Sequence, residues 1–306
     1  MAMRLVAIAI VCLLGGQPSF AQAPASNADD WILYERANAM LAQREFGQAL
    51  QLYKEAVSSA GIFPEAEIGI GDVYFEEGEF DLARAQYEKA YNLRSGFRIA
   101  DAQYEALYRL ADLFQGRQMY SEMEDSLLKI EVDDKRFSDA DSARVRTQVE
   151  KNYVEKGIDH TLLLYQFNVP FAEAAHSKLG WFYYRTGRYE QAIQELLYAV
   201  IYSSTQVNAA LRGLDVEYQY TTLGGMLDAV QANKELTRFV TTSDFFMNLY
   251  YLAAASYVAG YPAHSTELWR VVSTSKISGK YAALSARQLK APWVERIPGP
   301  GRAGSY

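Results

Sequence analysis

The chain contains two closely similar segments, Phe46–Ala56, FGQALQLYKEA, and Phe80–Ala90, FDLARAQYEKA. Both place an aromatic residue, an alanine, a tyrosine and a second alanine at one spacing, as Phe46, Ala49, Tyr53 and Ala56 and then as Phe80, Ala83, Tyr87 and Ala90. The second stretch begins 34 residues after the first, and a similar one follows at Tyr189–Ala199, YEQAIQELLYA. Self-similarity at a fixed period indicates stacked structural repeats.

A second, shorter pattern precedes two of these stretches. Ile70, Gly71 and Tyr74 come before Phe80, and Leu179, Gly180 and Tyr183 come before Tyr189. Together the two patterns resemble the tetratricopeptide repeat, in which Leu-Gly-x2-Tyr is followed by Ala-x3-Phe and a further alanine. The resemblance implies an all-α, right-handed superhelical solenoid of antiparallel helix pairs, with binding of other proteins as its function.

Numbering by this pattern divides most of the chain into repeats. We expect clear repeats at residues 30–63, 64–97, 104–137, 173–206 and 246–279, degenerate repeats at 139–172 and 207–245, and a capping helix at 280–290. In the repeat 207–245 we expect the turn at Thr221–Gly225. Small residues are expected where paired helices cross, because only they let the backbones approach. These packing residues are Ala49, Ala56, Gly71, Ala83, Ala90, Gly180, Ala192 and Ala199.

The two ends of the chain have a different composition. Arg4 precedes the apolar stretch Leu5–Leu14, and the small residues Ser19 and Ala21 follow, which is typical of a secretory signal peptide over residues 1–21. We expect a flexible mature N-terminus at 22–29, a disordered tail at 291–306 and a periplasmic or secreted protein. Cys12 lies inside the signal, so a mature chain would have no thiol chemistry. Lipidation at Cys12 is the alternative.

The composition of the chain indicates a folded core and excludes some classes of partner. Half of the residues are hydrophobic and 22% are charged, which suits a chain able to bury a continuous core. The 37 acidic and 30 basic side chains give a net charge of −7, and loss of Arg4 with the signal would make it −8. This acidity argues against nucleic acid and against anionic membrane surfaces as partners.

The resemblance also indicates where a partner would bind. In the tetratricopeptide family, the first helices of the repeats line a concave surface that holds peptides or partner helices. By register, the partner-binding residues here are Trp31, Tyr34, Asn38, Asp72, Phe75, Tyr108, Asp112, Trp181, Tyr184, Tyr250 and Tyr257. This surface is aromatic and acidic. Tyrosine and tryptophan often anchor interfaces, although some of these rings could instead fill gaps between helices.

Members of the family that bind chaperones use lysine, asparagine and arginine to clamp a C-terminal carboxylate. At the equivalent positions only Asn38 fits, whereas Asp72 and Asp112 are acidic. The sequence therefore favours an envelope protein or peptide with basic residues as partner.

Catalytic and metal-binding patterns are weak. His160, His176 and His264 are widely separated, and no His-Glu-x-x-His motif occurs. His176 falls on a packing position, so we interpret it as a core residue. The sequence thus predicts no catalytic residue, no metal site and no cofactor.

These observations favour an exported, non-enzymatic scaffold or adaptor that mediates protein–protein interactions in the cell envelope. One alternative is a ligand-binding accessory protein of a solute transporter, with the aromatic groove holding a small molecule. Another is a helical-toroid enzyme, which would require opposed carboxylates such as Asp72 and Asp112 in one closed cavity.

Overall fold

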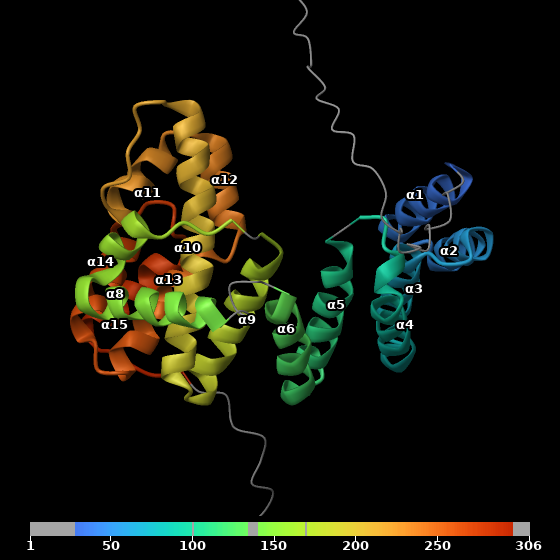
Figure 1. Cartoon of the computed structure of the whole chain (residues 1–306), viewed down its shortest axis with the longest axis horizontal. Coiled ribbons are helices and arrows are strands. Elements are labelled where there is room, and N and C mark those ends of the chain that lie inside the picture. Colours follow the sequence, from blue (N-terminus) through green and yellow to red (C-terminus); the bar gives the residue numbers. More distant parts are fainter. Residues whose placement is uncertain (1–27, 100, 134–139, 169, 296–306) are drawn as a thin grey trace, which may run out of the picture. The chain divides into compact units, whose positions relative to one another are not determined.

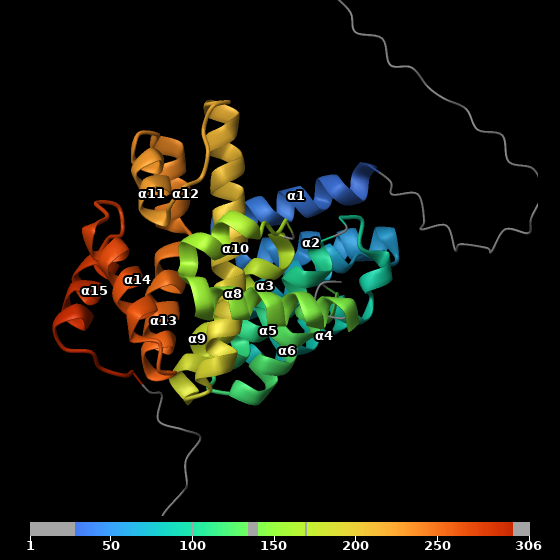
Figure 2. The ribbon, with the colours of Figure 1, turned by 60° about the vertical axis from the view of Figure 1, so that its left-hand side comes forward.

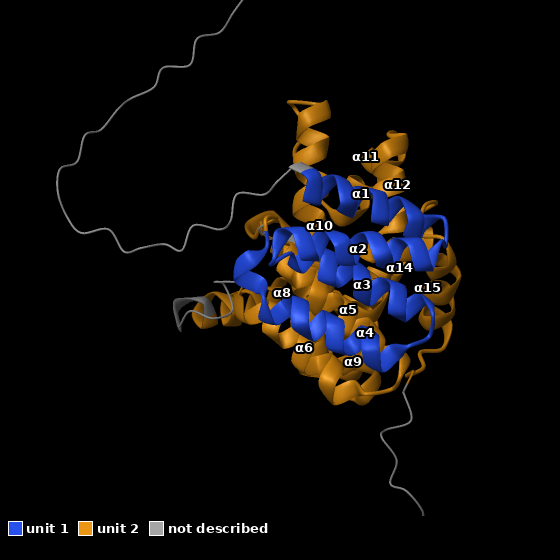
Figure 3. Ribbon diagram, turned by 90° about the vertical axis from the view of Figure 1, so that its right-hand side faces the viewer, with its two compact units in different colours: residues 1–97 blue, residues 98–306 orange. Residues whose placement is uncertain are grey.

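The computed structural model describes residues 28–99, 101–133, 140–168 and 170–295. Across these ranges the chain is α-helical and contains no β-strand (Figure 1). The residues expected to form the signal peptide, most of the flexible N-terminus and most of the tail lie outside the described residues. The chain divides into two compact units, residues 1–97 and 98–306 (Figure 3).

Unit 1 is built from two helix pairs and a short 3-10 helix. Its elements are α1 (Ala28–Ala42), α2 (Phe46–Ala60), α3 (Pro64–Glu76), α4 (Phe80–Asn92) and η1 (Arg94–Gly96). Helix α1 packs on α2 and α3 on α4, while α2 also packs on α3. Arg44 and Gly78 have positive φ angles, 63° and 83°, in the turns within the pairs. Gly78 adopts this left-handed conformation without strain, whereas Arg44 is a less common occupant.

Unit 2 contains the remaining helices. They are α5 (Ala102–Gly116), α6 (Tyr120–Asp133), α8 (Ala140–Leu164), α9 (Pro170–Thr186), α10 (Tyr189–Leu214), α11 (Leu223–Gln231), α12 (Lys234–Thr242), α13 (Phe245–Val258), α14 (Pro262–Thr274) and α15 (Lys280–Lys290). The pairs α5–α6, α9–α10, α11–α12 and α13–α14 pack in sequence order, and α15 follows α14 (Figure 2). Helix α9 also contacts α6 and α13, so it lies at the centre of this unit.

The small residues expected at helix crossings are all buried. A Cβ atom added to Gly71 would lie 2.4 Å from Cε1 of Tyr87, and one added to Gly180 would lie 2.5 Å from Cγ of Leu196. Each glycine therefore admits a large side chain from the second helix of its own pair. The all-α class with antiparallel helix pairs is confirmed.

Within the degenerate repeat 139–172, residues 140–164 form two helices that meet at a kink at Gly157, whose φ is 81°. The next segment differs from the expected arrangement. In the repeat 207–245, α10 extends to Leu214 because Val207, Asn208 and Leu211 bury one face of its last turns. The helix pair of this segment is α11–α12. Thr221–Gly225 is therefore not its turn, since the Thr222 hydroxyl caps the start of α11 by accepting from the amide of Gly225.

Candidate functional site

The predicted partner-binding residues of unit 1 share one surface, which we call the first-helix face. It comprises Trp31, Tyr34 and Asn38 on α1 and Asp72 and Phe75 on α3. Helices α1 and α3 are in contact, so the two sets are neighbours. Phe75 is 37% exposed and the other four are half-buried. The first-helix face thus combines exposed ring area with rings fixed by packing.

Two tyrosines of the second helices hold the polar residues of this face in place. The Tyr53 hydroxyl donates to Oδ1 of Asn38 at 2.6 Å, and the Tyr87 hydroxyl donates to Oδ1 of Asp72 at 2.7 Å. Both bonds span 15 residues and repeat at the same register. Burial raises the pKa of Tyr53, and the nearby Tyr34, Asp72 and Glu35 raise it further. Acidic side chains of both α1 (Glu35) and α3 (Asp72) therefore act on the Tyr53 phenol.

The corresponding residues at the start of unit 2, Tyr108 and the exposed Asp112, both contact α9. The Tyr108 hydroxyl on α5 donates to the carbonyl of Phe171 at 2.5 Å and accepts from the amide of Ala175 at 3.0 Å. Nζ of Lys178 on α9 lies 2.5 Å from Oδ1 of Asp112. These contacts tie α5 to α9.

The predicted residues on α9 and α13 are mostly enclosed. Tyr184 and Tyr250 are each 1% exposed, and their hydroxyls accept from the Glu295 amide at 3.2 Å and from Nε2 of Gln288 at 3.0 Å. Their assignment to an open binding surface is therefore corrected. The repeat register could not reveal this burial, because neighbouring segments of unit 2 cover both rings.

Two predicted residues of unit 2 retain exposed area. Trp181 is half-buried, with the guanidinium of Arg185 5.2 Å from its ring centroid. Tyr257 is 40% exposed and packs 5.8 Å from Trp269. Their role in partner binding stays a prediction.

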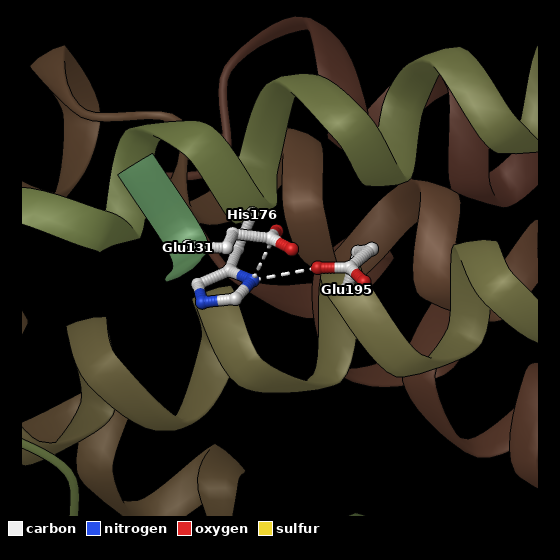
Figure 4. A group of neighbouring side chains, drawn as sticks. All are labelled: Glu131, His176 and Glu195. Carbon is white, nitrogen blue, oxygen red and sulfur yellow. Dashed lines mark hydrogen bonds and ion pairs between the residues drawn. The ribbon is translucent and has the colours of Figure 1, made fainter. Parts of the chain in front are cut away.

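A buried cluster in unit 2, Glu131, His176 and Glu195, was missed as a site at the sequence level (Figure 4). Nδ1 of His176 lies 2.6 Å from Oε2 of Glu195 and 3.1 Å from Oε1 of Glu131. The three side chains come from α9, α10 and α6. His176 is fully buried, as its packing position predicts, and both glutamates are 6% exposed.

The cluster shifts the protonation of its own members. Burial lowers the pKa of His176, but attraction to Glu131 and Glu195 outweighs burial and raises it to about 10. Burial and repulsion by Glu131 raise the pKa of Glu195 to about 8, against the opposing effect of His176. The cluster therefore retains protons that exposed groups of the same types would lose.

The helix pairs, the small-residue crossings and the first-helix face together define a helical-hairpin repeat protein. The tetratricopeptide repeat family model matches residues 34–96 and 160–207. These two segments are therefore tetratricopeptide repeats, and the resemblance noted in the sequence is confirmed there. Such repeats generally serve as scaffolds for protein–protein interaction, so the chain is an interaction scaffold in this broad sense.

One similar protein is an uncharacterized protein of Treponema pallidum (strain Nichols), 24% identical over 253 residues. The match covers 81% of this chain, and the chain spans 66% of that relative.

Two solved structures were also compared. The TPR2AB domain of yeast Sti1, in a complex with pHSP90, has a TM-score of 0.32 at 14% identity and covers 85% of this chain and 95% of its own. Yeast Tom70 has a TM-score of 0.30 at 12% identity, and the match covers 86% of this chain and 55% of the Tom70 chain. Within the described ranges of this chain, no helix combines the length and apolar character needed to cross a membrane.

Proposed function

We propose that this protein is an exported, non-enzymatic scaffold that binds an envelope protein or peptide through the first-helix face of unit 1. The observation that carries this proposal is the contrast between equivalent residues. Phe75 is exposed on unit 1 and Asp72 bonds within its own helix pair, whereas Tyr108 and Asp112 in unit 2 bond to α9. The first-helix face therefore offers aromatic area that the fold has not already used.

The same face supports a partner that carries lysine or arginine. Asp72 and the exposed Glu35 lie around the Tyr53 phenol, and the chain as a whole is acidic. Opposite charges across an interface speed association and favour the matching partner. Rings already ordered by packing lose little side-chain entropy on binding: Trp31, for example, stacks on Phe63 with ring centroids 5.3 Å apart.

Export is supported by the sequence of the first residues alone. Arg4, the apolar stretch Leu5–Leu14 and Ala21 form the pattern of a cleavable signal peptide. N-terminal sequencing of the protein recovered from its native cells tests this part. We expect a mature start between Gln22 and Ser26, and an intact Met1 would contradict export.

The binding face is tested by charge reversal with a matched control. Glu35→Lys changes an exposed carboxylate on α1, and Glu55→Lys changes an exposed one on α2. Partners of each variant are crosslinked in the native organism and identified by mass spectrometry. We expect the partner recovered with the unchanged chain to be lost with Glu35→Lys and kept with Glu55→Lys. Equal recovery with both variants would contradict the assignment of the face.

A further inference from the structure

We propose that Glu131, His176 and Glu195 bind a divalent transition-metal cation of the zinc type in the core of unit 2. The donor atoms of the three side chains lie within 4.8 Å of one another (Figure 4). They come from three helices, so a bound ion would link α6 to the α9–α10 pair. The inference is independent of the first-helix face.

The arrangement around the histidine is that of a ligand set. Both carboxylates approach the same ring nitrogen, Nδ1, at 2.6 Å and 3.1 Å. A single ring nitrogen carries at most one proton, so two carboxylate oxygens compete for it. Of the contacts within the described residues, none gives Oε1 of Glu131 a hydrogen bond of normal geometry, although this atom is buried. A cation between the three groups would satisfy all of them at once.

The charges of the three side chains also favour a bound cation. In the metal-bound form two ionised carboxylates and a neutral imidazole carry a charge of −2, which a divalent cation would neutralise, so binding would displace the protons that otherwise compensate this buried charge. Glu131 also lies in the last turn of α6, where the helix dipole disfavours an anion.

Unit 1 has a polar cluster at the equivalent repeat positions, and there a lysine supplies positive charge. Glu67 occupies the repeat position of His176, and Gln86 occupies that of Glu195; each pair is separated by 19 residues. Nζ of Lys89 lies 2.6 Å from Oε1 of Glu67 and supplies the positive charge there. In unit 2 the position of Lys89 holds Tyr198, an uncharged ring that stacks on His176. In unit 2 the positive charge therefore comes either from a proton held by His176 or from a bound cation that displaces this proton.

The ligand chemistry selects the class of metal. Imidazole with carboxylates suits zinc and similar ions, whereas magnesium and calcium prefer oxygen donors alone. Zinc bonds to nitrogen and oxygen at about 2.1 Å place neighbouring donors about 3.4 Å apart. The distances of 2.6 Å and 3.1 Å from Nδ1 of His176 to the two carboxylates would widen by less than about 1 Å to reach that value. Tyr198 and Tyr202 flank the imidazole, each with its ring centroid 5.6 Å away, and fix its orientation.

Zinc content and thermal stability test the proposal directly. The full-length chain is stripped with a chelator, supplied with equimolar zinc or magnesium, and desalted. We expect about one zinc per chain by elemental analysis and a rise in melting temperature of about 5 °C or more with zinc only. Cobalt should give visible absorption bands from imidazole and carboxylate ligation. Loss of zinc on desalting, with no rise in melting temperature, would overturn the proposal and leave a cluster held by shared protons.

Matched variants assign the site. Glu131→Gln and Glu195→Gln keep the side-chain size, and each is expected to weaken zinc binding at least tenfold. Glu124→Gln removes a carboxylate of the same helix α6 that pairs with Arg188, and His264→Gln removes a histidine that bonds to the carbonyl of Val154. Both controls should bind zinc as the unchanged chain does. Undiminished binding by a correctly folded Glu195→Gln variant would refute the site.

Discussion

The two units place polar pairs at the same positions of the repeat but neutralise them differently. In unit 1, Glu67 accepts from Gln86 and pairs with Lys89, whose side chain is 53% exposed. In unit 2, His176 faces Glu195 and also Glu131 from another helix pair, and all three are buried. In unit 1 the charge of Glu67 is thus neutralised within one helix pair, whereas the cluster of unit 2 combines side chains from three helices.

The same difference extends to the surfaces. Polar bonds of unit 1 join neighbouring helices of one hairpin, as Tyr53 to Asn38 and Tyr87 to Asp72 do. Those of unit 2 also join distant segments, such as the hydroxyls of Tyr153 and Ser256 at 2.7 Å. Side chains committed to distant internal contacts are not available to a partner. The first-helix face of unit 1 is therefore the surface that we assign to the partner.

Replacement of His176 gives the largest expected effect. His176→Ala leaves two buried carboxylates facing each other, so we expect it to lower the free energy of unfolding by about 3 to 5 kcal/mol. The counterpart Glu67→Gln removes a charge whose partner Lys89 can turn into solvent, and should cost about 1 kcal/mol. Urea unfolding followed by circular dichroism measures both. Equal losses would break the distinction between the two clusters.

The next largest expected loss of stability comes from replacing Gly180 or Gly71, the glycines at the helix crossings. A Cβ atom at Gly180 would meet the backbone nitrogen of Leu196 at 3.0 Å as well as its side chain, whereas one at Gly71 would meet only the ring of Tyr87. We expect Gly180→Ala to destabilise by about 3 kcal/mol and Gly71→Ala by about 2 kcal/mol. Gly47→Ala has open space and serves as control, with a small gain in stability. A neutral Gly180→Ala variant would argue against this helix register.

Removal of single hydroxyls tests the repeated tyrosine bonds of unit 1. Tyr87→Phe loses a bond to a carboxylate and should destabilise by about 1.5 to 2 kcal/mol, while Tyr53→Phe loses a bond to a neutral amide and should cost about 1 kcal/mol. Thermal unfolding measures the two variants side by side. The reverse order would show that the charge of Asp72 does not strengthen its bond.

Alkaline pH should affect unit 2 more than unit 1. Burial, reinforced by neighbouring negative charges, raises the pKa values of Tyr104, Tyr184 and Tyr281 in unit 2 to about 12, while unit 1 contributes the raised pKa of Tyr53. An unfolded phenol ionises near pH 10 while the folded one keeps its proton, so stability is intact below about pH 10 and falls as pH rises above it.

Tyrosinate absorbance followed through an alkaline titration measures this effect. We expect a steep rise in tyrosinate absorbance as unit 2 unfolds. The pH at the midpoint of this rise should be higher in Tyr184→Phe and unchanged in Tyr53→Phe. A gradual rise with no loss of helix would mean that the phenols ionise in the folded protein.

The sequence predicted the fold well where the repeat pattern is regular. The positions of α1–α4 follow from Phe46, Phe80 and the residues aligned with them, since local periodicity sets helix faces and turns. It predicted less in unit 2. The length of α10 depends on burial of Val207 and Leu211, and the enclosure of Tyr184 depends on segments far along the chain.

The Glu131–His176–Glu195 cluster could not be predicted for the same reason. The register alone pairs His176 with Glu195, as it pairs Glu67 with Gln86. Glu131, however, reaches His176 through the packing of α6 on α9, which no spacing within one repeat encodes. The two metal ligands on one hairpin were thus accessible to sequence comparison between repeats, but the third was not.

The most direct test of the central claim, that the first-helix face of unit 1 meets the partner, is site-specific photocrosslinking in the native organism. A photoreactive phenylalanine analogue replaces Phe75 on α3, Leu82 on α4 or Leu289 on α15, all of which are exposed. We expect position 75 to crosslink one defined partner and positions 82 and 289 to give none. Crosslinks to that partner from 82 or 289, with none from 75, would contradict this assignment.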